Sequence, residues 1–379
     1  MPAANRPHIF DLDSASLREL VSQWGWPAFR ADQVLEWVYR HAVADPAAMT
    51  NLAARDRQML AERVVFLAGE TVADLTGSDR TRKLLLRWNP TPLAASRRDT
   101  PVSLVLANGT SPVQETECVM IPADDRRTAC ISSQVGCPVG CTFCASGIGG
   151  LDGNLTAGRI VEQVWLLNRD LHALGERISN VVFMGMGEPL ANYAAVMRAV
   201  RTLMAPWGLH IGARRITIST VGLPRAIERL ADEALPVTLA ISLHAPNDAL
   251  RRQLIPWAEY TTIADLMDAG RYYFTQTGRE VTLEYILLGG VNDRPEHADQ
   301  LASVARTLRA NVNLIRYNEV AGLPYERPGD AAVRTFQEVL VQRGVNVHIR
   351  ASRGRDIAAA CGQLRHEHRE SREASSTGG

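Results

Sequence analysis

The chain has 379 residues, with 41 basic and 41 acidic side chains, so its formal net charge is zero. Hydrophobic residues make up 46% and charged residues 22%, which is typical of a globular protein with a sizeable core. A neutral chain is not steered toward nucleic acid as a whole, so any affinity for RNA has to come from local basic patches.

The sequence gives no sign of a membrane segment or a disulfide scaffold. No apolar run approaches the length of about 18 residues that a transmembrane helix needs, and residues 1–7 lack the apolar part of a signal peptide. Six cysteines, three of them clustered, fit metal or redox chemistry in a reducing compartment. We therefore expect a cytoplasmic protein that does not associate with membranes.

The basic residues are almost all arginine, and Lys83 is the only lysine. Arginine binds phosphate through two parallel hydrogen bonds and stacks on bases, which suits RNA binding. The same excess also arises in GC-rich genomes, whose codons favour arginine. Composition alone therefore leaves both explanations open.

Residues 8–68 have the apolar spacing of amphipathic helices. Gly25 and Pro27 separate two of these helices, as stop and start signals do. Trp37 and Tyr39 fit a helix core better than RNA-stacking positions. We predict a helical accessory domain over residues 1–90.

The next segments change to strand-like composition, with a turn signal at Asn108-Gly109. They are residues 84–88, 102–107 and 116–121. We predict a β-extension over residues 91–122 that leads into the main domain.

From residue 127 the pattern alternates between strands and helices, and the clearest helix begins after Thr156 and ends at Gly175. The predicted strands are 127–132, 180–184, 215–220, 237–243, 281–287 and 311–316, followed by a seventh piece at 345–350. Such alternation predicts an α/β fold of parallel βα units. Six units favour a partial (β/α)6 TIM-type barrel over 123–364, with a doubly wound open sheet as the competing topology. The polar tail 365–379 is predicted to be disordered.

Three cysteines lie close together in the segment Cys137-x3-Cys141-x2-Cys144. Thiolates are the usual ligands of iron–sulfur clusters, and three of them leave one iron of a 4Fe–4S cluster open to another ligand. Zinc knuckles instead bring together two C-x2-C pairs, and the chain has no second pair. The spacing is that of radical S-adenosylmethionine (SAM) enzymes.

Polar side chains follow several predicted strands, at the end where parallel sheets build their sites. They are Gly187-Glu188, Ser219, Ser242-Leu243-His244 and Asn318. A carboxylate can pair with an ammonium group, and hydroxyls, an amide and an imidazole suit a ribose and a purine. A single histidine such as His244 is usually a satisfied core residue, so the prediction of a ligand site rests on the set.

Three further cysteines lie outside the cluster. Cys118 has strand neighbours and fits a buried apolar thiol. Cys130 stands seven residues before Cys137. Cys361 is followed directly by a glycine near the chain end, and whether its thiol reacts stays open from the residues alone.

The chain resembles the radical-SAM adenine methyltransferases that modify 23S rRNA. The matching segments are 135–144, 180–192 (NVVFMGMGEPLAN), 214–220 (RRITIST), 241–248 (ISLHAPND), 290–293 (GVND), 313–318 (NLIRYN) and 356–364. The likeness runs from residues 27–37 to Leu364. Within the family, Pro189 favours the branch that methylates carbon 2 of adenine over the antibiotic-resistance branch that methylates carbon 8, although residues 315–318 and 149–151 look closer to the latter.

The resemblance implies the site and its chemistry. One 4Fe–4S cluster is expected on Cys137, Cys141 and Cys144, and SAM on the strand-end residues named above. Two SAM molecules are expected per turnover: one methylates Cys361 and the other generates the radical that activates this methyl group. Glu117 is implied as the proton acceptor, and Cys130 as the thiol that releases RNA from Cys361 through a transient disulfide.

The resemblance also implies the partners: 23S rRNA, tRNA with its adenosine 3′ of the anticodon, and an electron donor such as flavodoxin. A monomer is expected. The alternatives are a radical-SAM enzyme with a substrate other than RNA, and an iron–sulfur electron carrier or RNA-binding factor without turnover.

Overall fold

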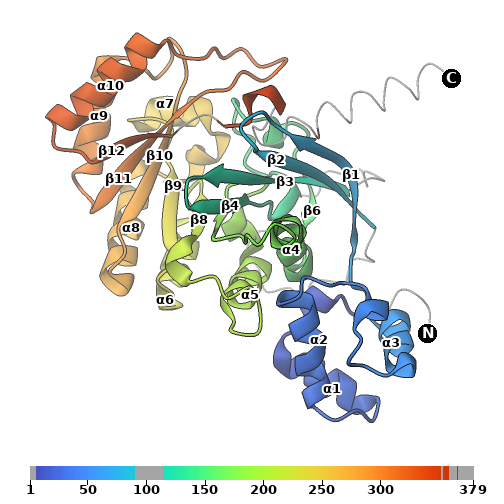
Figure 1. Cartoon of the computed structure of the whole chain (residues 1–379). Helices are drawn as coiled ribbons and strands as arrows, with labels where there is room; N and C mark the ends of the chain where they lie inside the picture. The colour runs from blue at the N-terminus through green and yellow to red at the C-terminus, as the bar shows by residue number, and fades with distance from the viewer. Residues whose placement is uncertain (1–5, 90–113, 351–352, 358–364, 366–379) are drawn as a thin grey trace.

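The computed structural model describes residues 6–89, 114–350, 353–357 and 365. A helical N-terminal unit comes first, below the sheet in Figure 1. It consists of η2 (Ile9–Asp11), α1 (Ser14–Gln23), α2 (Phe29–Tyr39), η3 (Pro46–Ala48) and α3 (Ala54–Arg63). Asp13 starts α1 with a capping box, because its side chain accepts from the Ser16 N–H and the Ser16 side chain accepts in return.

The N-terminal unit packs against the main domain through buried contacts. Tyr39 is 4% exposed and Trp37 packs against the core, so the prediction that these aromatic residues serve the core is confirmed. The Trp165 indole N–H of α4 (Ala157–His172) donates to the Val38 carbonyl at 2.7 Å. The Asp11 carboxylate accepts from the Gly158 N–H at 2.6 Å, in the first turn of α4. One continuous core therefore joins the two units.

A ten-stranded sheet forms the centre of the molecule. Its strands, in spatial order, are β1 (Gly69–Thr76), β2 (Arg82–Trp88), β3 (Gln114–Ala123), β4 (Arg126–Cys130), β7 (Asn180–Phe183), β8 (Ile216–Thr220), β9 (Thr238–Ser242), β10 (Val281–Leu287), β11 (Ala310–Arg316) and β12 (Val347–Arg350). The pairs from β1 to β4 are antiparallel. Those from β4 to β12 are parallel.

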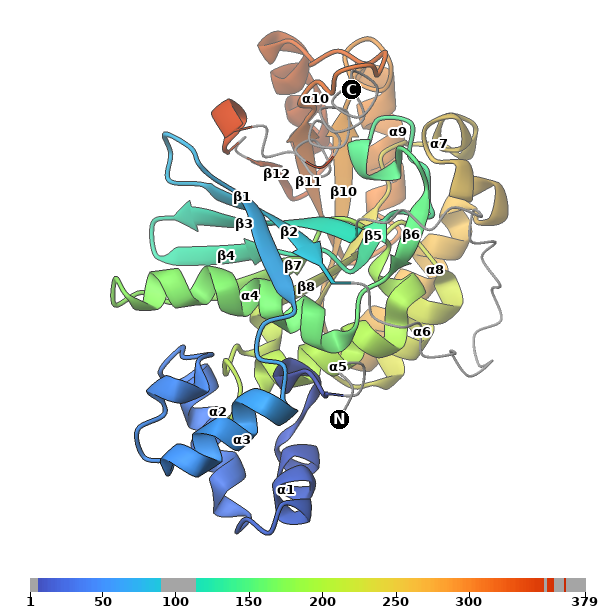
Figure 2. The same cartoon turned by 90° about the vertical axis from the view of Figure 1, so that its right-hand side faces the viewer.

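Helices connect the parallel strands and cover one face of the sheet, as Figures 1 and 2 show for α4, α5, α6 and α8. After α4 come α5 (Tyr193–Met204), α6 (Pro224–Asp232), α7 (Asp248–Leu254), α8 (Ile263–Thr277), α9 (Pro295–Ala305) and α10 (Asp330–Gln342), with the short turns η4 (Ala145–Gly147), η5 (Pro189–Asn192), η6 (Ala213–Arg215), η7 (Pro256–Tyr260) and η8 (Arg355–Ile357). The Thr156 side chain caps α4 as predicted, since it accepts from the Arg159 N–H. Gly175, where the sequence predicts the stop, has φ of 72°.

The strand order decides between the two predicted topologies. The parallel strands follow one another in chain order without the reversal that a doubly wound sheet requires. Contacts across the curved sheet agree: Arg350 at the end of β12 lies 3.7 Å from the Met184 sulfur, just after β7. The fold is therefore the predicted partial barrel, here with a seventh parallel strand and an antiparallel extension.

The predicted strands of the barrel agree with the structure to within a few residues, and β10 has the predicted bounds 281–287. The helices predicted over 8–68 also form. The strand predicted at 102–107 lies outside the described residues. Strand β1 and the two-stranded hairpin β5 (Gln134–Gly136) with β6 (Leu151–Asn154) were missed. Sheet pairing begins at Gly69, and the domain boundary at residue 90 stays a prediction.

Within the described parts of the chain, no helix is both long and apolar enough to cross a bilayer.

Candidate active site

The three clustered cysteines lie on a loop whose two ends the β5–β6 hairpin holds. Cys137 follows β5, and its N–H donates to the Gly150 carbonyl at 2.9 Å. Gly136 has φ of 77°, and a Cβ there would lie 2.1 Å from the Gly150 oxygen. Only glycine fits at this position without displacing the hairpin. The backbone therefore fixes where the loop begins.

An apolar cluster supports the cysteine loop from below. Val139 and Phe143 pack among residues of the loops that follow the strands, and Cys137, Cys141 and Cys144 pack against the same cluster. The Thr142 N–H donates to the Leu254 carbonyl at 3.0 Å, which ties the loop to α7. This packing and the Thr142 hydrogen bond fix the cysteine loop against the loops that follow the strands.

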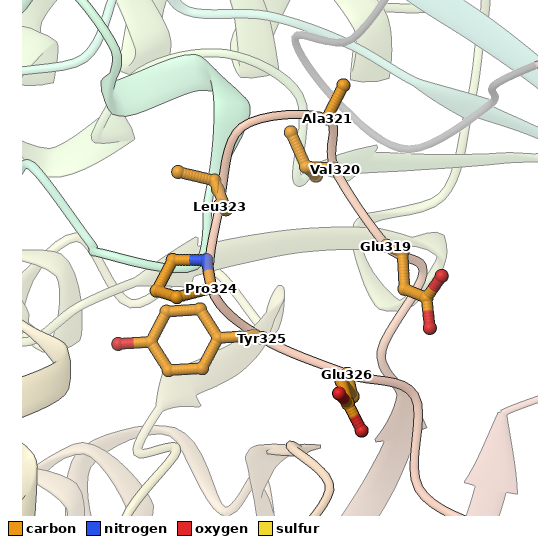
Figure 3. A pocket seen from close by; sticks show the side chains of 7 residues that line it. All are labelled: Glu319, Val320, Ala321, Leu323, Pro324, Tyr325 and Glu326. Carbon is orange, nitrogen blue, oxygen red and sulfur yellow. The ribbon is translucent and has the colours of Figure 1, made fainter.

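The loop over residues 319–326 covers the cysteine loop on another side. The Tyr325 hydroxyl lies 2.7 Å from the Thr142 hydroxyl. Residues 319–321 and 323–326 also line an open cavity of about 610 Å³, shown in Figure 3 with Glu319 and Glu326 on one flank and Tyr325 on the other. A single loop lines this cavity, so it forms a rim of the site rather than its centre.

The thiols influence each other's charge. Burial raises the pKa of Cys137 to about 12, and the neighbouring Cys144 adds to this shift. Burial, followed by Cys144 and Cys137, also raises the pKa of Cys141 well above its usual value. Such thiols stay protonated without a metal, so metal binding has to release their protons.

The donor set fits a cluster with several irons. Within the described residues, no three His, Cys, Asp or Glu side chains are grouped to hold one metal ion. A 4Fe–4S cluster differs, because each thiolate binds its own iron. The Ser146 hydroxyl, two residues after Cys144, is buried and makes no hydrogen bond in the described structure. A polar atom left without a partner beside the thiols is consistent with a bound group there.

Gly187 and Glu188 lie after β7, beside the start of the cysteine loop. The Glu188 N–H donates to the Gln134 side-chain oxygen at 2.8 Å. Gly187 has φ of 101°, and a Cβ there would lie 2.6 Å from the Gln134 Cβ. A side chain at position 187 would therefore collide with Gln134, in a backbone conformation that favours glycine.

The Glu188 carboxylate connects the ends of two strands. Its Oε1 accepts from the Leu190 N–H at 2.9 Å and its Oε2 from the Val221 N–H, just after β8, at 2.8 Å. Burial raises its pKa to about 7, although these two N–H groups act in the opposite direction. The Thr220 side chain donates to the carboxylate as well. Two carboxylate oxygens offer about four acceptor positions, so one is left for a ligand.

His244 follows β9 and has φ of 57°, an unusual conformation for a residue that is not glycine. Its Nδ1 accepts from the Ile286 N–H at 3.1 Å, so the neutral ring carries its proton on Nε2. Burial lowers the pKa of His244 to about 3, with the Arg251 charge adding to the shift. The ring stands edge to face against Phe143 of the cysteine loop, with centroids 5.2 Å apart. His244 is thus a neutral ring held next to the cysteine loop.

The hydroxyl pair Ser219 and Ser242 lies on the inner face of the barrel, with oxygens 3.3 Å apart. Their neighbours Ile218 and Ile241 point to the helices and pack in the main core. Leu243 is one of those core residues too, so its side chain cannot contact a ligand, and its N–H already donates to the Glu284 carbonyl at 3.0 Å. The Asn318 side-chain oxygen accepts from Arg327 at 2.8 Å.

Glu117 and Cys130 lie on neighbouring strands and on the same face of the sheet. Cys130 is paired with Val119, two residues beyond Glu117 on β3. Cys118 and Ala129 alternate to the other face and pack in the main core. The predicted buried apolar role of Cys118 is confirmed, and burial raises the pKa of its thiol. Glu117 and Cys130 therefore extend the inner surface of the barrel.

Cys361 lies outside the described residues, but residues on both sides of it contact the β1–β2 turn, β3 and β6. The Asp356 carboxylate accepts from the Ser78 N–H in the β1–β2 turn at 2.7 Å. The Arg365 N–H donates to the Glu117 Oε1 at 2.6 Å, and the Arg365 guanidinium pairs with Asp152 of β6. The chain after β12 thus returns to Glu117.

Three residues with a part in this geometry were missed at the sequence level. Gln134 contacts the backbone of Glu188. The Arg251 guanidinium is buried and donates to the Val221 carbonyl at 2.5 Å. The Asn292 amide donates to the carbonyls of His244 and Ile286. The GVND segment carried a signal for Asn292, whereas nothing in the pattern indicated that Arg251 is buried.

A fourth missed residue lines the barrel interior. The Glu284 Oε1 accepts from the Asn313 amide at 3.0 Å, while its Oε2 is buried and makes no hydrogen bond with a described residue. Burial raises the pKa of this carboxyl. Its neighbour Tyr285 faces α10 and stacks near Phe336, so Glu284 faces the interior.

A parallel partial barrel with three loop cysteines beside polar strand ends defines a radical-SAM enzyme. The sequence profile of the Radical SAM superfamily matches residues 131–302. The profile of the ribosomal RNA large subunit methyltransferase N-terminal domain matches residues 8–66.

Whole-chain relatives identify the family. The probable dual-specificity RNA methyltransferase RlmN of Dictyoglomus thermophilum is 41% identical over 94% of this chain and 96% of its own. The protein of the same name from Symbiobacterium thermophilum is 46% identical over 92% of this chain and 88% of its own. A solved radical SAM methyltransferase from Sphaerobacter thermophilus is 42% identical and superposes with a TM-score of 0.86, covering 94% of this chain and 98% of that one. The chain belongs to the RlmN family of dual-specificity radical-SAM RNA methyltransferases.

Proposed function

We propose that this enzyme methylates carbon 2 of an adenine in 23S rRNA and of the adenosine 3′ of the anticodon in tRNAs. The observation that carries the proposal is the cysteine loop at the mouth of the barrel, in a chain that is 41–46% identical over nearly its whole length to relatives named dual-specificity RNA methyltransferases. An aromatic amidine carbon is electrophilic, so direct methyl transfer from a sulfonium does not proceed there.

Cys137, Cys141 and Cys144 would hold a 4Fe–4S cluster, and SAM would bind beside it. When bound, the reduced cluster and SAM supply a one-electron cleavage that yields a carbon radical able to remove a hydrogen atom. The protein's part is to bind, orient and exclude water. Glu188 offers a carboxylate to the SAM ammonium group, and Gly187 lets the backbone approach the ligand.

The remaining contacts with SAM would come from the inner face of the barrel. The Ser219 and Ser242 hydroxyls suit the ribose, and the His244 Nε2–H and Asn318 suit other polar atoms of the ligand. Leu243 would contribute its backbone alone, because its side chain is fully buried in the core. The unpartnered oxygen of Glu284 adds an acceptor on the same surface.

Three residues would act on the methyl group and the RNA. The Cys361 thiolate attacks the methyl carbon of one SAM, the carbon–sulfonium bond breaks, and S-adenosylhomocysteine leaves. The S-methyl group formed on Cys361 is then carried to the adenine. Glu117 accepts the proton that the substituted carbon has to lose. Cys130 then forms a disulfide with Cys361, which releases the RNA. In support, Glu117 and Cys130 share one face, and the backbone of Arg365 contacts Glu117.

The adenine has to leave its stack to enter the barrel, at a cost of a few kcal/mol. Contacts with RNA phosphates have to offset this cost. We assign them mainly to the N-terminal helical unit, which belongs to the accessory domain proposed for residues 1–90. We also propose a flavodoxin-type electron donor as a partner. The enzyme itself is proposed to be a monomer.

The test compares the wild-type protein with a Cys137→Ala/Cys141→Ala/Cys144→Ala variant and a Cys118→Ala control, all reconstituted without oxygen. Wild type and control should bind about four iron atoms per chain and transfer labelled methyl groups from SAM to RNA. The triple variant should do neither. Iron retained by the triple variant, or wild-type protein that cleaves SAM without methylating RNA, would contradict the proposal.

A further inference from the structure

Lys83 is the only lysine of the chain, and it is fully buried. It lies on β2, and its Nζ is 2.8 Å from the Glu117 Oε2. Lysine is almost never buried without a partner, since removing an ammonium group from water costs several kcal/mol. Burying the ion pair of Lys83 and Glu117 between β2 and β3 costs desolvation free energy that an apolar pair would not cost. A role beyond joining the two strands would explain why the pair is there.

The pair lies on the inner face of the sheet, away from the main core. Leu84 and Cys118 alternate to the other face and pack in that core. The register pairs Lys83 with Val119, and Val119 with Cys130 on the next strand. Lys83 therefore belongs to the row of residues that includes Cys130, and it reaches Glu117 along the diagonal.

Both oxygens of the Glu117 carboxylate are engaged. Oε2 faces the Lys83 ammonium group, and Oε1 accepts from the Arg365 N–H at 2.6 Å. The Glu117 carbonyl accepts from the Ser132 hydroxyl at 2.6 Å, which fixes the backbone beneath. The carboxylate is thus held in one orientation by a cation on one oxygen and a backbone donor on the other.

We infer that Lys83 is a positioning residue for Glu117, whose carboxylate it holds in one orientation. The inference rests on the proposed role of Glu117 as proton acceptor. In that step the carbon–hydrogen bond of the RNA adduct breaks, the proton moves to a Glu117 oxygen, and the electron pair stays with the ring. An ionised carboxylate is required at the start, and the ammonium group stabilises that form in a site with little water.

A purely structural ion pair would lead to different results, so the variants are chosen to separate the two roles. Lys83→Met removes the charge and keeps the length, Lys83→Arg restores the charge, and Glu117→Gln removes the carboxylate. We expect Lys83→Met to lower kcat for RNA methylation by about 10²-fold with KM for RNA little changed. Lys83→Arg should recover most of the rate.

The double variant Lys83→Met/Glu117→Gln tests the coupling. If Lys83 acts through Glu117, adding Lys83→Met to Glu117→Gln should cause no further loss. Additive losses would overturn the inference, and so would a Lys83→Met protein with the wild-type kcat. A Glu117→Gln protein that methylates RNA at the wild-type rate would instead refute the proposed role of Glu117 itself.

A spectroscopic test does not depend on activity or on variants of Lys83. Because the chain has a single lysine, labelling with [13Cε]lysine gives one lysine signal in the full-length protein. This signal should show a charged, immobile ammonium group in wild type and should shift in Glu117→Gln, while Glu115→Gln on the same strand should leave it unchanged. A signal typical of mobile, exposed lysine, or one that ignores Glu117→Gln, would overturn the inference.

Discussion

Replacement of Glu162 by alanine should uncouple the N-terminal unit from the barrel. Glu162 lies in α4 and is fully buried. Its Oε1 accepts from the Gly69 N–H at 2.9 Å, its Oε2 accepts from the Ala68 N–H at 3.0 Å, and Oε2 lies 3.0 Å from the His8 Nε2. One side chain therefore serves the start of the N-terminal unit and the start of β1.

The expected loss of stability follows from the buried N–H groups of Ala68 and Gly69, which lose their acceptor when Glu162 is replaced. Removing one member of a buried charged network typically costs about 3–5 kcal/mol, since each buried donor without an acceptor costs about 1–3 kcal/mol. With an unfolding entropy of roughly 2.1 cal/mol/K per residue over 379 residues, a loss of ~4 kcal/mol lowers Tm by about 5 °C if the chain unfolds as one unit.

Thermal unfolding followed by circular dichroism measures this shift, with Glu338→Ala on the exposed side of α10 as the control. A Glu162→Ala protein whose Tm lies within about 1 °C of the control would refute the role of Glu162 as the link between the two units.

Two further predictions concern the site, and a third concerns RNA binding by the N-terminal unit. Cys130→Ser should accumulate RNA covalently attached to protein on denaturing gels, whereas Cys118→Ser, on the core face, should turn over normally; equal behaviour of the two would contradict the assignment. Burial raises the pKa of Glu188 from 4.5 to about 7, so the folded state binds a proton more tightly than the unfolded state. The cofactor-free protein should therefore lose about 3 kcal/mol of stability between pH 4.5 and 7, and urea titrations should show that Glu188→Gln removes this loss. Arg55→Ala on the exposed side of α3 should reduce the slope of log Kd for RNA against log salt by about 0.9, while Arg334→Ala on α10 should leave it unchanged.

The barrel could be predicted because the pattern that specifies it is local in the sequence. Each strand of the parallel sheet is a short apolar run followed by a helix, and the alternation itself implies parallel pairing. The cysteine loop could be predicted equally well, since the spacing of Cys137, Cys141 and Cys144 is a short-range pattern. Pro189 and its neighbours likewise carried the family resemblance.

The missed features depend on long-range geometry. Strands β1 and β6 contain glycine and are partly exposed, so they lack the apolar runs of central strands. Strand β5 is buried but only three residues long, too short to give a strand pattern. The pair of Lys83 with Glu117 depends on the register between β2 and β3, which spans a segment of more than thirty residues along the chain. The burial of Arg251 follows from a carbonyl contributed by the loop after β8.

The tail illustrates the same limit. The sequence predicted a disordered end from residue 365, yet Arg365 is buried and pairs with Asp152. The polar sequence near the chain end gave no sign of the two partners of Arg365, Glu117 and Asp152. Both lie more than two hundred residues earlier in the chain. Contacts of this length cannot be predicted from local composition.

The most direct test of the account identifies the product. The reconstituted protein is incubated without oxygen with SAM, a reductant and unmodified 23S rRNA, and the digested RNA is analysed by chromatography and mass spectrometry. We predict 2-methyladenosine from wild-type protein and no methyladenosine from a Cys361→Ala variant. 8-Methyladenosine would contradict the carbon-2 assignment, and methylation by the Cys361→Ala variant would contradict the proposed route through the cysteine.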